Sequence, residues 1–150
     1  MELNDDLIIP APKETVFAAI RDPEVLRRCI PGCEELVQLA PEEFEAAVVL
    51  KIGPVKARFG GRVVLDTAGG PDRFSLTGEG KGGAAGFAKG GADVTLTEVE
   101  GGTRLSYAAK AEVGGKIAQL GSRLIQGTAK KLSDKFFTAF AAEVTESRVE

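Results

Sequence analysis

The sequence predicts an α+β fold of the helix-grip type, in which a curved seven-stranded antiparallel sheet wraps around a long C-terminal helix. Three observations support this class. Apolar and polar residues alternate from residue 34 to residue 113, as they do in strands that bury one face. From Lys116 onward the apolar residues instead recur at three- and four-residue steps, as in an amphipathic helix. One strand and two short helices are predicted before both regions.

The N-terminal region predicts that strand and those two short helices in order. Residues 2–9 form the strand, which ends at Pro10. Residues 12–20 have the apolar spacing of a helix. A second short helix is predicted over residues 24–28, and Pro31-Gly32 ends it.

Six further strands are predicted between residues 34 and 113, and glycine-containing turns separate several of them. In each strand the apolar residues share one face, so each should bury that face and expose the other. The residues predicted to face inward are Phe44, Ala46, Val48, Leu50 and Ile52; Val55, Ala57, Phe59, Gly61, Val63 and Leu65; Phe74 and Leu76; Ala92, Val94 and Leu96; and Leu105, Tyr107, Ala109, Ala111 and Val113.

The long helix is predicted to begin near Lys116 and to run for roughly 28 residues, or about 42 Å, which is enough to cross the whole sheet. A chain of 150 residues is expected to form one domain with a single core. We therefore predict one domain over residues 1–145 and a polar C-terminal tail over residues 146–150.

The composition argues against several classes of function. The net charge is −3, so no basic field would attract nucleic acid. The chain has no histidine, which removes the commonest general base and metal ligand. Cys29 and Cys33 are spaced C-x3-C with no second pair to complete a zinc site, so buried or half-buried thiols are expected. We predict no metal, no required cofactor and, without a secretory signal, a cytoplasmic protein.

The segment from Gly78 to Leu96, GEGKGGAAGFAKGGADVTL, begins with the pattern G-x-G-x-x-G. In a dinucleotide site such glycines lie between a strand and a helix, whereas a strand pattern follows here. We therefore interpret the segment as a hairpin whose strands cover residues 73–80 and 87–98. Glycine inside a strand commonly marks the close approach of another backbone or of a ligand.

Small residues are expected on the inner wall of the sheet, among them Ala46, Gly61, Gly90 and Ala109. They allow two outcomes. The helix either packs close to the sheet in a solid core, or an apolar cavity remains between the two, which is the outcome we favour. The predicted cavity residues are Phe17, Phe44, Val48, Phe59, Val63, Phe74, Leu76, Ala92, Leu105, Tyr107, Gly121, Leu124, Ile125 and Thr128.

A ligand of this cavity would be largely hydrophobic, because Tyr107 and Thr128 are the obvious polar groups in the predicted lining. Catalysis would need an acid or base inside the cavity. The candidate carboxylates fall on the outward-facing positions of the strands: Glu45, Glu79, Asp93 and Glu112. We therefore expect a binding protein, with an enzyme as an alternative.

Four segments carry a resemblance to a known family: CIPGCEEL (29–36), KIGPVKARFGG (51–61), GEGKGGAAGFAKGGADVTL (78–96) and VGGKIAQLGSRLIQGTAKKLSDKFF (113–137). They resemble the family of the carbon monoxide dehydrogenase G-subunit, which belongs to the START-like (SRPBCC) superfamily. The resemblance implies a START-like helix-grip domain with a non-catalytic, accessory role beside a molybdenum hydroxylase of the carbon monoxide dehydrogenase type. It also implies a bound quinone or other lipophilic molecule. For the enzyme alternative it implies a cyclase or hydrolase, as some START-like relatives are. The protein would lie at the inner face of the cell membrane through partners, with at most peripheral membrane contact.

Docking of the hydroxylase is expected around the CIPGC turn and the glycine hairpin. A structural adaptor with a solid interior would use the same surface without any ligand. Pro31-Gly32 would either close the cavity mouth as a lid or simply stop the preceding helix. The predicted entrance and docking residues are Cys29, Pro31, Gly32, Cys33, Gly82, Gly83 and Phe87.

Overall fold

The computed structural model describes residues 1–149, with side chains described as far as Thr145. One antiparallel sheet of seven strands has the order β1-β7-β6-β5-β4-β3-β2, which confirms the predicted class. The strands are β1 (Glu2–Ile9), β2 (Cys33–Ala40), β3 (Glu43–Ile52), β4 (Val55–Asp66), β5 (Arg73–Lys81), β6 (Phe87–Val99) and β7 (Gly102–Gly114).

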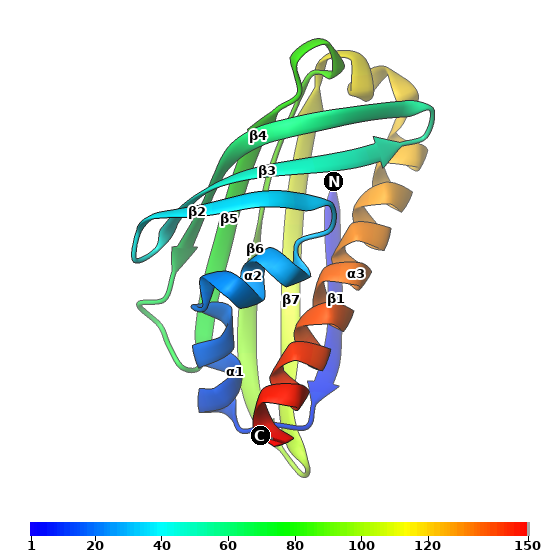
Figure 1. The fold of residues 1–150 in the computed structure, drawn as a ribbon. Helices are drawn as coiled ribbons and strands as arrows, with labels where there is room; N and C mark the ends of the chain where they lie inside the picture. Colours follow the sequence, from blue (N-terminus) through cyan, green and yellow to red (C-terminus); the bar gives the residue numbers. More distant parts are fainter. Residues whose placement is uncertain (150) are drawn as a thin grey trace.

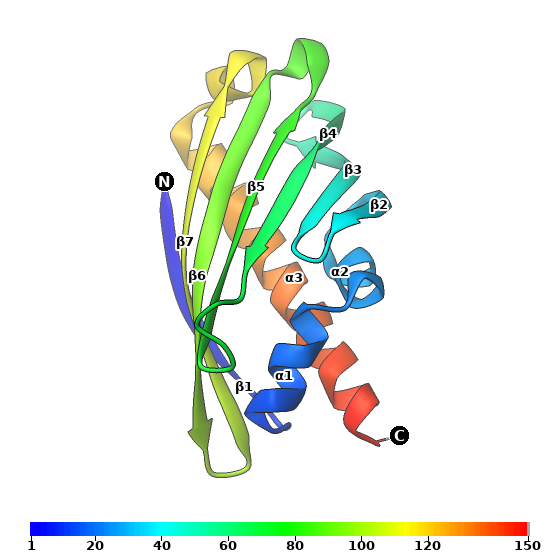
Figure 2. The same ribbon diagram turned by 90° about the vertical axis from the view of Figure 1, so that its left-hand side faces the viewer.

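All the helices lie on one side of the sheet. The long helix α3 (Ser122–Val149) crosses the sheet diagonally, and the short helices α1 (Lys13–Ile20) and α2 (Pro23–Cys29) lie beside its C-terminal half (Figure 1). Seen from the side, β2, β3 and β4 curl toward the helices (Figure 2). The concave face of the sheet is therefore covered, and the convex face is not.

The short helices begin where the sequence predicts. Pro23 occupies the first turn of α2, and the Asp22 carboxylate accepts a hydrogen bond of 2.9 Å from the backbone N–H of Glu24. That bond satisfies one of the free N–H groups at the start of the helix. The helix ends at Cys29, and Pro31-Gly32 leads directly into β2.

The prediction that the long helix begins near Lys116 is wrong, because α3 begins at Ser122. Gly121 has φ +97°, a left-handed conformation that ends the preceding 3-10 helix η2 (Gly115–Leu120) and separates it from α3. The separate turn lets Ile117 become fully buried. At the other end the helical backbone continues to Val149, into the predicted tail over 146–150. The side chains of that tail, and Glu150, lie outside the described residues.

The strand register confirms the predicted inward face. Ala46 pairs with Gly61, which pairs with Gly80 on the next strand. Leu76 likewise pairs with Ala92, and Ala92 with Ala109. Because paired residues point to the same side of a sheet, the small residues from β3 to β7 form one continuous inner surface.

Side chains pack the interior at two separate places. The main core lies where α1, α2 and the C-terminal half of α3 meet the sheet, and Leu26, Phe44 and Phe140 are fully buried there. A smaller cluster of Ile52, Phe59, Ala85 and Ile117 closes the opposite end. The small-residue surface of the sheet lies between these two clusters.

Candidate functional site

Two adjoining apolar pockets lie on the concave side of the sheet. The helix pocket, of about 330 Å³, is bordered by α2, α3, β1 and strands β4 to β7. The hairpin pocket, of about 300 Å³, is bordered by strands β3 to β7 and the turn after α2. Each has a volume at the lower end of the range of small-molecule sites.

The floor of both pockets consists of residues with little or no side chain. Glycine is needed at Gly90, where a Cβ would lie 2.6 Å from the carbonyl oxygen of Lys110. At Gly78 the nearest atom would be 3.6 Å away, so a side chain there would fit. Where the pockets meet, the floor is one residue from each of four neighbouring strands in register: Val63, Gly78, Gly90 and Ala111.

The middle of α3 forms the roof of the helix pocket. Ala129, Leu132, Ser133 and Phe136 line it at the three- and four-residue spacing of one helix face. The following residue, Phe137, also borders the pocket and stacks on Tyr107 with ring centroids 4.3 Å apart. This stack ties the roof to β7, next to the main core.

Several predicted cavity residues pack away from the pockets. Phe44, Phe74, Leu105 and Tyr107 are buried in the main core, and Phe17 packs against that core. The residues of the predicted set that border the pockets are Val48, Phe59, Val63, Leu76 and Ala92.

The cavity residues predicted on the long helix lie at or just before the start of α3, N-terminal to the part of the helix that forms the roof. Leu124 is 38% exposed and lies against Gly53 of the β3–β4 turn. Ile125 is buried, whereas Gly121 is exposed, with open space where a Cβ would be. The Thr128 hydroxyl donates a hydrogen bond of 2.9 Å to the carbonyl oxygen of Leu124. None of these residues borders either pocket.

The polar side chains of the site also differ from Tyr107 and Thr128, the two predicted from the sequence. Tyr107 lies in the main core and Thr128 bonds within its own helix. Ser133 is the uncharged polar side chain that α3 places on the helix pocket. Sequence reasoning missed it and its neighbours because the apolar spacing of a helix does not say which of its turns lies over the glycines.

The predicted entrance residues occupy two separate places. Cys33 pairs with Val48, and Val48 with Phe59, whose ring lies where a Cβ on Gly82 would be. Strands β3 and β4 thus separate the CIPGC turn from the glycine hairpin. At the turn, Cys29 is buried, Pro31 is partly buried, and Gly32 has φ +71°. At the hairpin, Gly83 is exposed with φ +59°, and Phe87 is 45% exposed.

Both thiols are free, and both are shielded by the fold. Burial, with a smaller contribution from the Glu143 carboxylate, raises the pKa of Cys29 to about 11. Burial also raises the pKa of the half-buried Cys33. Roughly one Cys29 in a thousand would therefore be thiolate at about pH 8, and the thiolate is the reactive form.

We expect a thiol reagent at this pH to label Cys33 before Cys29 in the folded protein, and both at once in denaturant. Mass spectrometry of the modified peptides over time measures the order, and a Cys33→Ser variant isolates the reaction of Cys29. Equally fast labelling of the two thiols in the folded protein would contradict the burial described.

An enzyme would need carboxylates inside the cavity, but the candidate carboxylates lie on the convex face of the sheet. Two broader depressions there, of about 680 and 720 Å³, are bordered by charged residues of both signs together with glycine and apolar residues. Among the described residues no group of three or more acidic or cysteine side chains is arranged to hold a metal ion. No helix in the described range combines the length and apolar character needed to cross a membrane. The four candidate carboxylates are all exposed: Glu45, Glu79, Asp93 and Glu112.

Comparison with known proteins gives both a family and a fold. A family model for the G-subunit of carbon monoxide dehydrogenase (CoxG) matches residues 6–145. No curated protein sequence matches the chain. A conserved protein from Geobacillus kaustophilus is 30% identical in its crystal structure, with a TM-score of 0.89 over 98% of this chain and 97% of that one.

More distant solved structures share the fold alone. The ZhuI aromatase/cyclase from Streptomyces sp. R1128 is 14% identical, with a TM-score of 0.70 over 100% of this chain and 96% of that one. Ara h 8.0201 is 16% identical, with a TM-score of 0.67 over 97% of this chain and 98% of that one. These neighbours place the chain among START-like folds.

Proposed function

The chain belongs to the CoxG family, that of the carbon monoxide dehydrogenase G-subunit, and from this premise we propose that it is a non-catalytic protein that carries an apolar molecule. The molecule occupies the helix and hairpin pockets and is a quinone or a lipid. The protein it serves is a molybdenum hydroxylase of the carbon monoxide dehydrogenase type, which it assists at the inner face of the cell membrane.

The observation that carries this proposal is the space between the two packed clusters. Protein interiors are normally close-packed, with few voids larger than a water molecule. Here, glycine and alanine on the inner surface of five strands leave two pockets of about 300 Å³ each. Apolar concave space of this kind is where small molecules bind. The exposed position of the candidate carboxylates supports binding rather than catalysis.

Ser133 supports a ligand that has at least one polar atom. Its hydroxyl can donate a hydrogen bond to a carbonyl oxygen, such as that of a quinone ring. Most of the remaining lining offers apolar contact, mainly from Leu3, Leu26, Leu132 and Phe136. A ring held beside Ser133 with a chain on the glycine floor would match both parts of the site.

Displacement of a fluorescent apolar probe by a prenylated quinone tests the proposal. We expect displacement, together with a melting temperature that rises with quinone concentration. Ser133→Ala should weaken quinone binding about fivefold, which corresponds to one hydrogen bond of about 1 kcal/mol. The same variant should bind a hydrocarbon without oxygen atoms as the wild type does. A protein that neither displaces the probe nor gains thermal stability would contradict the carrier function.

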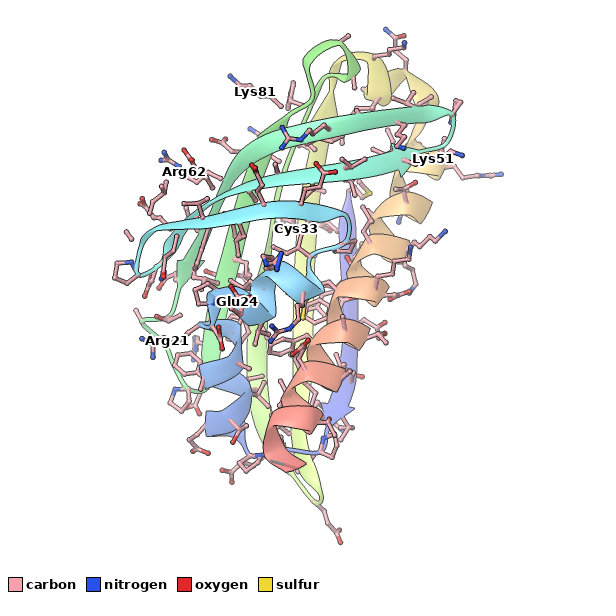
Figure 3. All side chains as sticks on the ribbon, viewed as in Figure 1. Arg21, Glu24, Cys33, Lys51, Arg62 and Lys81 are labelled. Carbon is pink, nitrogen blue, oxygen red and sulfur yellow. The ribbon has the colours of Figure 1, made fainter. Side chains whose placement is uncertain are left out.

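A second candidate function, an adaptor that docks the hydroxylase, is favoured by the charge at one end of the molecule. The β3–β4 turn, the glycine hairpin and η2 lie toward that end, where Lys51 and Lys81 are found (Figure 3). The whole chain has a net charge of −3, yet residues 50–58, 81–89 and 113–127 contain no carboxylate. The basic residues of these segments are Lys51, Lys56, Arg58, Lys81, Lys89, Lys116 and Arg123.

Most of these cations are free to meet a partner. Arg58 pairs with Glu34 at 3.1 Å, and Lys89 pairs with Glu112 at 3.2 Å. The other five make no ion pair with any residue whose side chain is described. Unpaired charge of one sign at one end favours docking onto an acidic protein surface and speeds the encounter.

Charge reversal tests the adaptor function with a matched control. Lys116→Glu/Arg123→Glu should weaken binding to the purified hydroxylase about tenfold at low salt, and the loss should shrink at high salt. Lys131→Glu/Lys135→Glu makes the same charge change on the exposed face of α3 and should have little effect. Equal losses from the two pairs, measured by surface plasmon resonance, would contradict docking at this end.

A further inference from the structure

The helix pocket and the hairpin pocket share five lining residues. Four of the residues that line both pockets belong to the floor row that crosses β4 to β7. The fifth, Ile30, comes from the turn between α2 and β2 and overhangs the floor from the opposite side. The shared residues are Ile30, Val63, Gly78, Gly90 and Ala111.

The turn holds Ile30 firmly in this position. The backbone N–H of Ile30 donates to the carbonyl oxygen of Leu26 at 2.9 Å, and its carbonyl oxygen accepts from the N–H of Cys33 at 3.2 Å. The carbonyl oxygen of Gly32 accepts a further bond of 2.9 Å from the N–H of Val49 on β3. Gly32 also contacts that strand so closely that a Cβ would overlap the Val49 carbonyl oxygen. The turn that carries Ile30 is therefore anchored to both α2 and β3.

We infer that Ile30 and Gly78 form a constriction through which the chain of one elongated apolar molecule passes. The inference rests on the proposed carrier function and specifies its ligand. The polar ring or head lies in the helix pocket beside Ser133, and the flexible chain reaches through to the hairpin pocket. Neither pocket alone is large enough for a ring together with a long chain. The absence of a side chain at Gly78 lets the chain lie directly on the backbone.

This arrangement makes the two residues determinants of chain length. A quinone ring without a side chain needs only the helix pocket, so its binding depends less on the passage into the hairpin pocket than the binding of a long chain does. A long-chain homologue gains apolar contact in the hairpin pocket, with about a fourfold increase in affinity for each additional buried methylene. The site therefore selects long-chain over short-chain molecules, provided that the passage stays open.

Binding of three homologous quinones tests the inference: the ring alone, a short-chain form and a long-chain form. Gly78→Leu and Ile30→Phe narrow the passage from opposite sides. Each should weaken long-chain binding at least tenfold more than it weakens binding of the ring alone. Adding Ile30→Ala to Gly78→Leu should restore long-chain binding, because removing bulk on one side compensates for bulk on the other. Circular dichroism checks the fold of each variant, and Gly78→Ala replaces Gly78→Leu if the latter does not fold.

The possible failures are distinguishable. If the wild type binds none of the three quinones, the carrier function is contradicted and this inference with it. If the wild type binds them, but the narrowing variants weaken ring and long chain equally or not at all, the constriction alone is overturned. Native mass spectra with two short-chain molecules on one protein and no preference for the long chain would overturn it as well, because the pockets would then be separate sites.

Discussion

Replacing Ala109 with phenylalanine is expected to lower the affinity for an apolar ligand roughly 50- to 100-fold while the protein stays folded. Ala109 lies on β7, and its side chain faces the helix pocket under the roof of α3. A phenyl ring there would take the place of ligand atoms. Excluding about 100 Å² of ligand surface costs about 2.5 kcal/mol of binding free energy, which gives the expected factor.

The preceding residue provides the control for this substitution. Ala108 pairs with Asp93 on the opposite face of the same strands and is exposed. Ala108→Phe therefore adds the same ring to the same strand outside the pocket, and should bind the ligand as the wild type does. Isothermal titration calorimetry with a long-chain quinone compares the two variants. Equal affinities would mean that the concave pocket is not the binding site.

Replacing Phe140 with alanine is expected to lower the free energy of unfolding by about 3–5 kcal/mol. Phe140 is fully buried in the main core. Its ring lies 6.2 Å from that of Phe136, so α3 is anchored just beyond the roof of the pocket. Since a domain of this size is stable by about 5–15 kcal/mol, the variant should be close to unfolding. Urea denaturation measures the loss.

A residue about two turns earlier on the same side of α3 should behave differently. Leu132 is half-buried and borders the helix pocket. Leu132→Ala enlarges an existing space instead of creating a new cavity, so it should cost about 1 kcal/mol or less of stability. It should weaken ligand binding instead, because it removes apolar contact from the roof. If Leu132→Ala cost as much stability as Phe140→Ala, the roof would belong to the packed core.

Local patterns were sufficient to predict the sheet. Alternation along each strand placed Ala46, Ala92 and Ala109 on one inner surface, and the register confirms that placement. The glycines that resemble a nucleotide-binding motif form the hairpin of β5 and β6 because a strand follows them. These features depend on neighbours in the sequence or on the next strand, so periodicity and turn residues determine them.

The pocket itself depends on how distant elements meet, and the sequence could not predict that. Glycine is a poor helix former, but the φ of +97° at Gly121 and the separate turn it produces are properties of the folded chain. Ser133 rather than Thr128 borders the pocket, and the Thr128 hydroxyl bonds within its own helix instead. Ile30 directly precedes the turn residues Pro31 and Gly32 and gives no signal of its own. The role proposed for Ile30 depends on where the turn after α2 lies relative to the glycines of the sheet, which is a property of the folded chain.

Native mass spectrometry of the protein, purified without detergent from cells that make prenylated quinones, tests the central claim most directly. We predict a complex with one apolar molecule, which collisional activation releases and which organic solvent extracts. The same preparation of the Ala109→Phe variant should show the free protein. Wild-type protein that carries only its own mass, and that stays so after a long-chain quinone is added, would contradict the existence of a ligand site beneath α3.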